Sequence, residues 1–275
     1  MRLAIIGMGA IGHVVKRALL SGGAGRVEIV EVDRTRSPLR NGEPAVDVAI
    51  ICTKTFGTAW AAEQAAKILS PRGVALTIQN GLGNEETIAE RVGAERAAAG
   101  VIYVGASLRP DGSLFATGPG RIELGTDPRL DALAAALAAG GMTVTRVADP
   151  RLAVWKKVLV NAAMNPTTAV FRITNGELVA HPAGAPLADG IAREVARVAT
   201  ACGAAIAEED GVAAWRQIAA TLGANRSSML QDVEADRLTE VESINGAVAR
   251  SGERVGIDAP LNRAFALLVG SFHPA

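Results

Sequence analysis

Residues 2–12 read RLAIIGMGAIG, an apolar run followed at once by three glycines in the pattern GxGxxG. An amphipathic segment, residues 11–20, continues directly from them. In a strand–turn–helix unit the first glycine permits the tight turn, the second lets the backbone approach a pyrophosphate, and the third allows helix and strand to pack closely. Because the N-terminus of a helix attracts phosphate, the stretch predicts a dinucleotide-binding turn. Its predicted cofactor-binding residues are Gly7, Gly9, Ala10, Ile11 and Gly12.

The alternation of apolar run and helical pattern continues through the first half of the chain. Three more apolar runs follow, RVEIVEV, VDVAIIC and GVALTI, and helical patterns at 58–69 and 84–92 come after the second and third. This order is typical of βαβ units on a parallel sheet. From Ala97 the pattern changes to short runs separated by Gly-rich turns and a PDG turn, which predicts appended antiparallel strands. A helix at 130–139 and the strand MTVTRV complete this half.

The second half of the chain has a helical pattern throughout. After Asp149-Pro150, Ala, Leu and Val recur at helical spacing to about Val269, and no strand pattern is present. Two capping boxes are expected at helix starts, Ser228 with Gln231 and Thr239 with Glu242. We therefore predict an α/β fold in which a Rossmann-type dinucleotide-binding domain, residues 1–148, precedes an all-α domain, residues 149–275.

Composition narrows the class of partner. The 275 residues carry 28 Lys plus Arg and 28 Asp plus Glu. This balance lacks the basic excess that draws proteins to nucleic acid or anionic lipid, so a small-molecule partner is expected. Cys52 and Cys202 have no CxxC or His companion, so we predict no metal site and no disulfide framework. No signal peptide or membrane span is recognisable, and a soluble cytoplasmic protein is expected.

The end of the second predicted strand bears on cofactor choice. An acid at this place accepts from an adenosine ribose hydroxyl and favours NAD, whereas an arginine holds a 2′-phosphate and favours NADP. The sequence offers both, with Glu31 and Asp33 on one side and Arg34 and Arg36 on the other. Solvated loop charges would look the same, so the charges alone leave the choice open.

A polar strip marks the helix that opens the second half. Lys157, Asn161 and Asn165 stand at i, i+4 and i+8 and share one helix face, and Pro166 is expected to end that helix. Three polar groups on an apolar helix need partners. They are either a satisfied network in the core or a strip facing the cofactor, where a partly desolvated Lys157 would hydrogen-bond a substrate carbonyl.

Over nearly its whole length the chain resembles the ketopantoate reductase (2-dehydropantoate 2-reductase) family. The matching segments are GMGAIG, CTK at 52–54, QNGLGNEE at 79–86, WKKVLVNAAMNPTTA at 155–169, NGEL at 175–178 and NRSSMLQDVEADRLTEVESING at 225–246. Together and in this order they are specific, and the resemblance implies the fold as well as the activity.

The resemblance also implies roles for individual residues. Lys157 matches the family's general acid, and Glu240 matches a glutamate that binds the substrate hydroxyl and pairs with that lysine. The other matches are Asn161, Asn165, Asn225 and Ser228 at the substrate, and Lys54 and Asn80 near the cofactor. By pattern alone, Ser228 would be a helix N-cap and Glu240 a first-turn acid favoured by the helix dipole.

The function that the resemblance implies is reduction of 2-dehydropantoate to (R)-pantoate, a step of pantothenate biosynthesis, by a homodimer. NADPH is the implied hydride donor, with Arg34 as a candidate contact and NAD as the alternative. Residues 35–45 are shorter than the family pattern, which bears on the adenosine end of the cofactor. A reductase of another 2-keto acid is the first alternative. A non-catalytic dinucleotide sensor is the second, and it would not require both Lys157 and Glu240.

Overall fold

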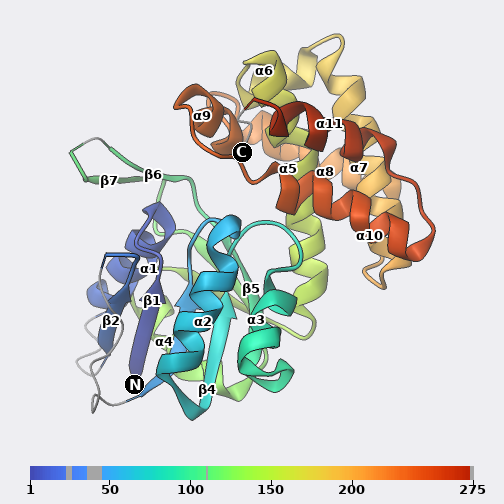
Figure 1. Ribbon diagram of the computed structural model, residues 1–275. Coiled ribbons are helices and arrows are strands. Elements are labelled where there is room, and N and C mark those ends of the chain that lie inside the picture. Colours follow the sequence, from blue (N-terminus) through green and yellow to red (C-terminus); the bar gives the residue numbers. More distant parts are fainter. Residues whose placement is uncertain (23–26, 36–44, 110, 273–275) are drawn as a thin grey trace. The chain divides into compact units, whose positions relative to one another are not determined.

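The apolar runs of the first half form a seven-stranded sheet with the order β2-β1-β3-β4-β5-β8-β9 (Figure 1). The computed structural model describes residues 1–22, 27–35, 45–109 and 111–272. The strands are β1 (Arg2–Ile6), β2 (Glu28–Val32), β3 (Val46–Ile51), β4 (Leu69–Thr77), β5 (Ala97–Tyr103), β8 (Arg121–Gly125) and β9 (Thr143–Val147). Every pairing from β2 across to β5 is parallel. This confirms the predicted βαβ arrangement.

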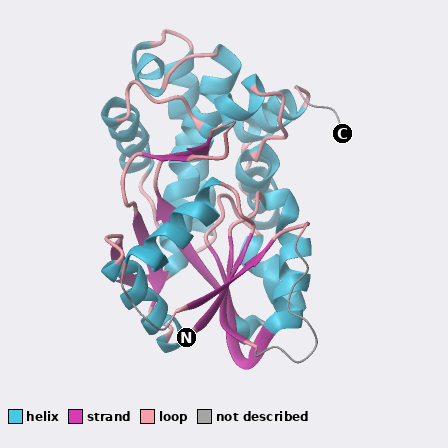
Figure 2. Cartoon of the chain, turned by 90° about the vertical axis from the view of Figure 1, so that its left-hand side faces the viewer, coloured by secondary structure: helices cyan, strands magenta, loops and turns pink. Residues whose placement is uncertain are grey.

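Both faces of the sheet are covered by helices, as Figure 2 shows. Successive side chains of a strand point to opposite faces, and β1 shows the consequence. Leu3 and Ile5 pack in one apolar cluster with residues of α1 and α4, whereas Ala4 and Ile6 pack in another with residues of α2 and α3. The helices are α1 (Ala10–Ser21), α2 (Thr58–Ile68), α3 (Asn84–Val92) and α4 (Asp131–Ala139).

The predicted antiparallel strands are present. β8 pairs antiparallel with β5, and β6 (Ala106–Leu108) pairs with β7 (Leu114–Ala116) in a separate two-stranded sheet. The turn between β6 and β7 includes Gly112 at φ +80°. Strand β9 then pairs parallel to β8. Among the described residues of this half, short 3-10 turns occur at η1 (Thr55–Gly57), η2 (Ala94–Arg96) and η3 (Pro128–Leu130).

Beyond β9 every element in the described part of the chain is helical, which confirms the predicted all-α second half. The helices are α5 (Pro150–Phe171), α6 (Asn175–Ala180), α7 (Gly184–Ala201), α8 (Glu208–Thr221), α9 (Ser228–Glu234), α10 (Ala247–Val255) and α11 (Pro260–Gly270). A π-helical turn, η4 (Glu242–Gly246), leads into α10. Such turns are rare and often occur at functional sites. Among the described residues, no helix is long and apolar enough to cross a membrane.

The chain divides into two units. Unit 1 comprises residues 1–79 and 83–153, and unit 2 comprises residues 80–82 and 154–275. The division falls after Ala153, inside α5, whereas the boundary expected from the sequence, after residue 148, precedes that helix. Three residues of the QNGLG loop therefore belong to unit 2, although the loop begins and ends in unit 1.

Candidate active site

The glycine-rich turn of unit 1 joins β1 to α1. Gly7 has φ +101°, and a Cβ there would lie 2.6 Å from the backbone N of Thr53. A Cβ on Gly12 would lie 2.2 Å from the carbonyl O of Gly7. Both glycines are therefore required by close backbone packing, whatever the turn binds.

Gly9 differs from these two glycines. It is the N-cap of α1 at φ −77° and ψ −167°, and a Cβ there would meet no described atom within 4 Å. The fold therefore leaves open space above Gly9, beside the first amides of α1, which include those of Ala10 and Ile11. Amides of the first helical turn have no partner within the helix, so the turn fits a bound pyrophosphate.

The acids at the end of β2 already have partners within the chain. The carboxylate of Glu31 pairs with the ammonium of Lys16 on α1, with Nζ and Oε1 2.6 Å apart. Asp33 Oδ1 accepts hydrogen bonds from the backbone N and the Oγ1 of Thr35, at 2.8 and 2.6 Å. Arg34 is exposed. The candidate Arg36, and most of the short segment from Thr35 to Ala45, lie outside the described residues.

Lys54 lies at the carboxyl edge of the sheet, where it precedes η1 and is half-buried. The loop that carries it is held by Gln79, which follows β4. Gln79 Nε2 donates to the carbonyl O and the Oγ1 of Thr53, at 2.9 and 3.0 Å, and to Thr58 Oγ1 at 2.9 Å. We did not predict this role for Gln79 from the sequence. The sequence could have indicated that Gln79 lies near the site, because a polar residue directly after a buried strand lies at the sheet edge where ligands bind.

Asn80 and Glu240 meet within unit 2. Asn80 Nδ2 donates to Glu240 Oε2 at 3.0 Å, and Glu240 is buried. The loop is fixed on the same segment, because the backbone N of Leu82 donates to the carbonyl O of Ser243 at 2.9 Å. Gly81 lies between them at φ +82°, where a Cβ would be 2.3 Å from that carbonyl oxygen. Only glycine fits this approach. Residues far apart in the sequence thus supply one polar pair.

The polar strip of α5 has the predicted register. Lys156 is exposed, Lys157 and Asn161 are partly buried, and Asn165 is buried. Burial lowers the pKa of Lys157 to about 8, and the negative charge of Glu240 acts in the opposite direction. A lysine with a pKa near neutrality is charged at pH 7 and still releases its proton readily.

The prediction that Pro166 ends this helix is wrong, because α5 continues to Phe171. Proline lacks the N–H that would bond the carbonyl O of Ala162, four residues earlier. Asn245 supplies the missing donor, with its Nδ2 3.1 Å from that oxygen. A side chain from another element thus allows the helix to pass through Pro166.

The predicted capping box at Ser228 is also wrong. The N-cap of α9 is Ser227, whose Oγ accepts from the backbone N of Leu230 at 3.1 Å and from Thr168 Oγ1 at 2.7 Å. Ser227 is buried and Ser228 is exposed. Ser228 therefore does not cap α9, and its contact with the substrate stays a prediction.

The second predicted capping box is wrong as well, because the N-cap of η4 is Val241 and it has no side-chain capping bond. Thr239 Oγ1 accepts from the backbone N of Val241 at 3.5 Å, whereas the carboxylate of Glu242 pairs with Arg250 at 2.9 Å. A complete capping box occurs instead at α6, between Thr174 and Glu177. The TxxE spacing there could have predicted it.

Asn225 lies on a loop that is held against the start of α6. The backbone N of Asn175 donates to the carbonyl O of Asn225 at 2.9 Å, and Gly176 donates in the same way to Gly223 at 2.9 Å. A Cβ on Gly176 would lie 2.8 Å from the Cα of Gly223, so two glycines permit this contact. The NGEL segment therefore positions the loop of Asn225.

These observations define a protein with a dinucleotide-binding α/β unit and an all-α unit that carries a desolvated lysine. A family model described as ketopantoate reductase PanE/ApbA matches residues 23–129, and the model for its C-terminal part matches residues 149–272. A 2-dehydropantoate 2-reductase of Archaeoglobus fulgidus is 33% identical over 98% of this chain and 96% of that relative. The chain belongs to the ketopantoate reductase family.

Solved structures show the same fold. The crystal structure of a 2-dehydropantoate 2-reductase from Geobacter metallireducens has a TM-score of 0.87 and 27% identity, over 98% of this chain and 99% of that one. A ternary structure of D-mandelate dehydrogenase with NADH and anilino(oxo)acetate has a TM-score of 0.88 at 23% identity, over 99% and 98% of the two chains. At this identity the second likeness concerns the fold alone.

Proposed function

We propose that this chain reduces 2-dehydropantoate to (R)-pantoate. The observation that carries the proposal is the constellation in unit 2, where burial lowers the pKa of Lys157 to about 8 and Glu240 is buried with Asn80 donating to its carboxylate. Membership of the ketopantoate reductase family supports this substrate. A nicotinamide dinucleotide held at the glycine-rich turn would supply the hydride for this reduction.

Lys157 is the proposed general acid. Its ammonium donates a proton to the carbonyl oxygen as negative charge develops there, and the lysine is left neutral until it regains a proton from solvent. Glu240, in the same unit, accepts a hydrogen bond from the substrate hydroxyl. Its contact with Asn80 orients the carboxylate. The remaining proposed substrate contacts are Asn161, Asn165, Asn225 and Ser228.

We propose a nicotinamide dinucleotide bound at Gly7, Gly9, Ala10, Ile11 and Gly12, with Lys54 beside it, and NADPH as the preferred form. Glu31 and Asp33, the acids that would otherwise accept from a ribose hydroxyl, are engaged with Lys16 and Thr35. Arg34 is exposed directly after them and could hold a 2′-phosphate. In this proposal Arg34→Ala weakens NADPH and spares NADH. Equal loss for both cofactors would contradict it.

Initial-rate assays with NADPH and NADH across a panel of 2-keto acids test the proposed function. We expect NADPH oxidation matched by pantoate formation with 2-dehydropantoate, and a higher kcat/KM for it than for the other compounds. If another 2-keto acid is clearly preferred, the substrate assignment is wrong and the chain is a relative with a different specificity. If no compound is reduced by a protein that binds NADPH, the enzyme assignment is wrong.

Two further parts of the proposal concern the protein as a whole. We propose a homodimer, supported by exposed apolar side chains at the end of the chain, Leu267, Leu268 and Phe272. Light scattering that gives a monomer at working concentration would contradict this. We also propose a cytoplasmic location, supported by Cys52 and Cys202, which are both free thiols. Cell fractionation tests it.

A further inference from the structure

Pro166 leaves the carbonyl of Ala162 without the donor that an uninterrupted helix would provide. This carbonyl lies in the turn of α5 that carries Asn161 and Asn165, one turn beyond Lys157. The side chain of Asn245, from the π-helical turn η4, donates to it at 3.1 Å. Asn245 is fully buried, so this donor comes from the protein rather than from solvent.

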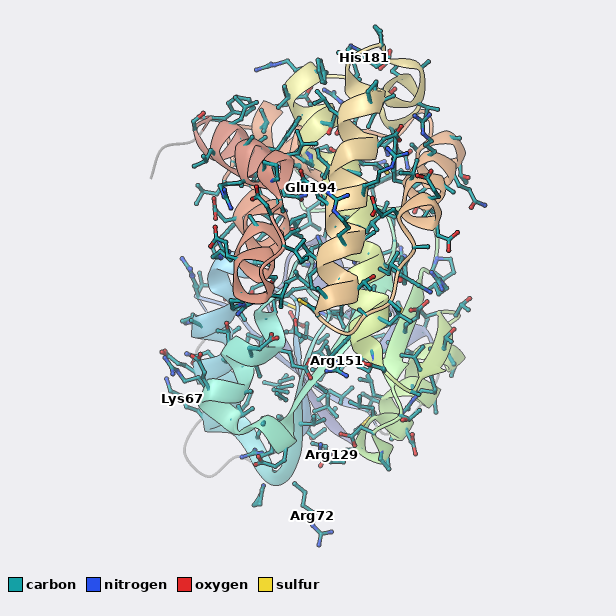
Figure 3. The ribbon with its side chains drawn as sticks, turned by 90° about the vertical axis from the view of Figure 1, so that its right-hand side faces the viewer. Lys67, Arg72, Arg129, Arg151, His181 and Glu194 are labelled. Atoms are coloured by element: carbon teal, nitrogen blue, oxygen red, sulfur yellow. The ribbon has the colours of Figure 1, made fainter. Side chains whose placement is uncertain are left out.

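The orientation of the Asn245 amide is fixed by a chain of hydrogen bonds that ends at a carboxylate. Glu194 of α7, labelled in Figure 3, is 3% exposed and accepts from the backbone N of Asn262 at 3.0 Å and from its Nδ2 at 2.9 Å. A carboxylate only accepts, so Asn262 must turn its Nδ2 to Glu194 and its Oδ1 to Asn245. Asn245 Nδ2 donates to that Oδ1 at 3.1 Å. Its NH2 group is thereby directed at both Asn262 and Ala162.

This orientation of the Asn245 amide leaves its oxygen without a hydrogen bond from the described part of the chain. The amide adopts it nevertheless, because the neighbouring hydrogen bonds require it. Asn245 Oδ1 is buried and has no hydrogen-bond partner among the described residues. A buried acceptor without a partner is unfavourable, because it has lost its hydrogen bonds to water. Reversing the amide would place this oxygen against two other acceptors, Asn262 Oδ1 and the carbonyl of Ala162. The arrangement therefore keeps the donor on the helix carbonyl.

One element joined by this contact carries a proposed catalytic group, and the other closely follows the second such group in the sequence. Helix α5 carries Lys157, and η4 begins two residues after Glu240, whose carbonyl O accepts from the backbone N atoms of Ser243 and Ile244 at 3.1 Å each. We propose that Asn245 is a positioning residue, which sets the register between the Glu240 segment and the polar strip of α5. This inference rests on the proposed function for its kinetic consequence, although not for its structural one.

The test is a rescue experiment. Asn245→Leu keeps the approximate size and removes the donor, and we expect kcat for 2-dehydropantoate to fall about 10- to 100-fold with KM for NADPH unchanged, as for a misplaced catalytic group. Adding Pro166→Ala gives residue 166 an N–H that can bond Ala162, and kcat should recover to within about threefold of wild type. Pro166→Ala alone should stay within about twofold.

A matched control separates positioning from lost stability. Val198→Ala removes buried side-chain volume from α7, outside this hydrogen-bond chain, and should lower the Tm while leaving kcat and its pH profile unchanged. In Asn245→Leu the pH at which kcat falls by half should move, because the surroundings of Lys157 change. Wild-type kcat in Asn245→Leu, or a loss that Pro166→Ala fails to recover, would overturn the proposal.

Hydrogen–deuterium exchange over residues 158–171 gives a readout that needs no activity. Exchange should rise in Asn245→Leu and return toward wild type in the double variant, even if 2-dehydropantoate is not the substrate. If Asn245→Leu does not fold, Asn245→Ser takes its place. If neither folds, recovery of a folded protein on adding Pro166→Ala supports the proposal, and failure of the double variants to fold overturns it.

Discussion

Two adjacent lysines on α5 have different surroundings. Lys156 is exposed, whereas burial lowers the pKa of Lys157 to about 8. One residue along a helix is a rotation of about 100°, so neighbours face different environments. A charged group that is poorly solvated releases its proton more easily, and this makes Lys157 the better acid of the two.

We predict that Lys157→Ala lowers kcat by about 10² to 10⁴, which corresponds to roughly 3 to 5 kcal/mol of barrier. Affinity for NADPH should stay within a few fold, because Lys157 belongs to unit 2 and the glycine-rich turn to unit 1. Steady-state kinetics and calorimetry measure the two effects. Lys156→Ala is the control and should cost little. Equal losses in the two variants would show that the register assigned to α5 is wrong.

The pH dependence of the reaction should report the same lysine. Reduction needs the protonated form, which is lost as the pH rises through the pKa of about 8. We therefore expect kcat for reduction to be level below that pH and to fall about tenfold per pH unit above it. Oxidation of pantoate needs the neutral form, so its kcat should rise over the same interval. A descending limb that persists in Lys157→Ala would assign it to another group.

At the scale of elements, the turn between β1 and α1 contains two glycines that the fold requires and a third, Gly9, that the proposed cofactor requires. Gly7 and Gly12 have no room for a Cβ, whereas Gly9 has open space and an extended backbone that any residue adopts. The GxGxxG pattern predicts this distinction. The structure makes it through the distances to Thr53 and to the carbonyl of Gly7.

Gly9→Val should therefore fold with a Tm near that of wild type and fail to bind NADPH, because its side chain would occupy the space that the pyrophosphate needs. Gly12→Val is the contrasting variant. Its Cβ would lie 2.2 Å from a backbone oxygen, so we expect it to be strongly destabilised. Calorimetry on folded Gly9→Val measures the outcome. Wild-type NADPH affinity in that variant would contradict the assignment of the turn.

Much at the element scale could be predicted from the sequence, because local patterns determine it. The glycine-rich turn, the βαβ order and the register of Lys157 on α5 follow from spacing and periodicity alone. The continuation of α5 through Pro166 could not be predicted in this way, because the donor that permits it, Asn245, is remote in the sequence.

The candidate site shows the same limit. By sequence pattern, Ser227 and Ser228 are both suitable N-caps of α9. In the structure the N-cap is Ser227, which also contacts Thr168 on α5. The pairing of Asn80 with Glu240 likewise depends on Gly81 fitting against Ser243. Tertiary contacts of this kind leave no periodic signal in the sequence. The sequence therefore identified candidate site residues, but it did not predict that Asn80 contacts Glu240 or that Ser227 contacts Thr168.

At the scale of the whole molecule, the residues proposed for cofactor binding and those proposed for proton transfer belong to different units. The glycine-rich turn, Arg34 and Lys54 belong to unit 1, and Lys157 and Glu240 belong to unit 2. Cofactor binding and proton transfer should then respond to separate substitutions. A ligand that binds only the folded state raises its stability, by about 2.7 kcal/mol at 100 times Kd, so thermal unfolding reports cofactor binding without chemistry.

We predict opposite signatures for one variant in each unit. Glu240→Gln should keep the rise in Tm that NADPH causes in wild type and lose kcat, by about 10²-fold on the scale of a general acid–base group. The negative charge of Glu240 raises the pKa of Lys157, so its removal should lower that pKa and move the descending limb of kcat below pH 8. Gly9→Val should lose the rise in Tm altogether. If Glu240→Gln also loses it, or if its pH limb moves upward, then the carboxylate acts on the cofactor rather than on the lysine and the division by unit is wrong.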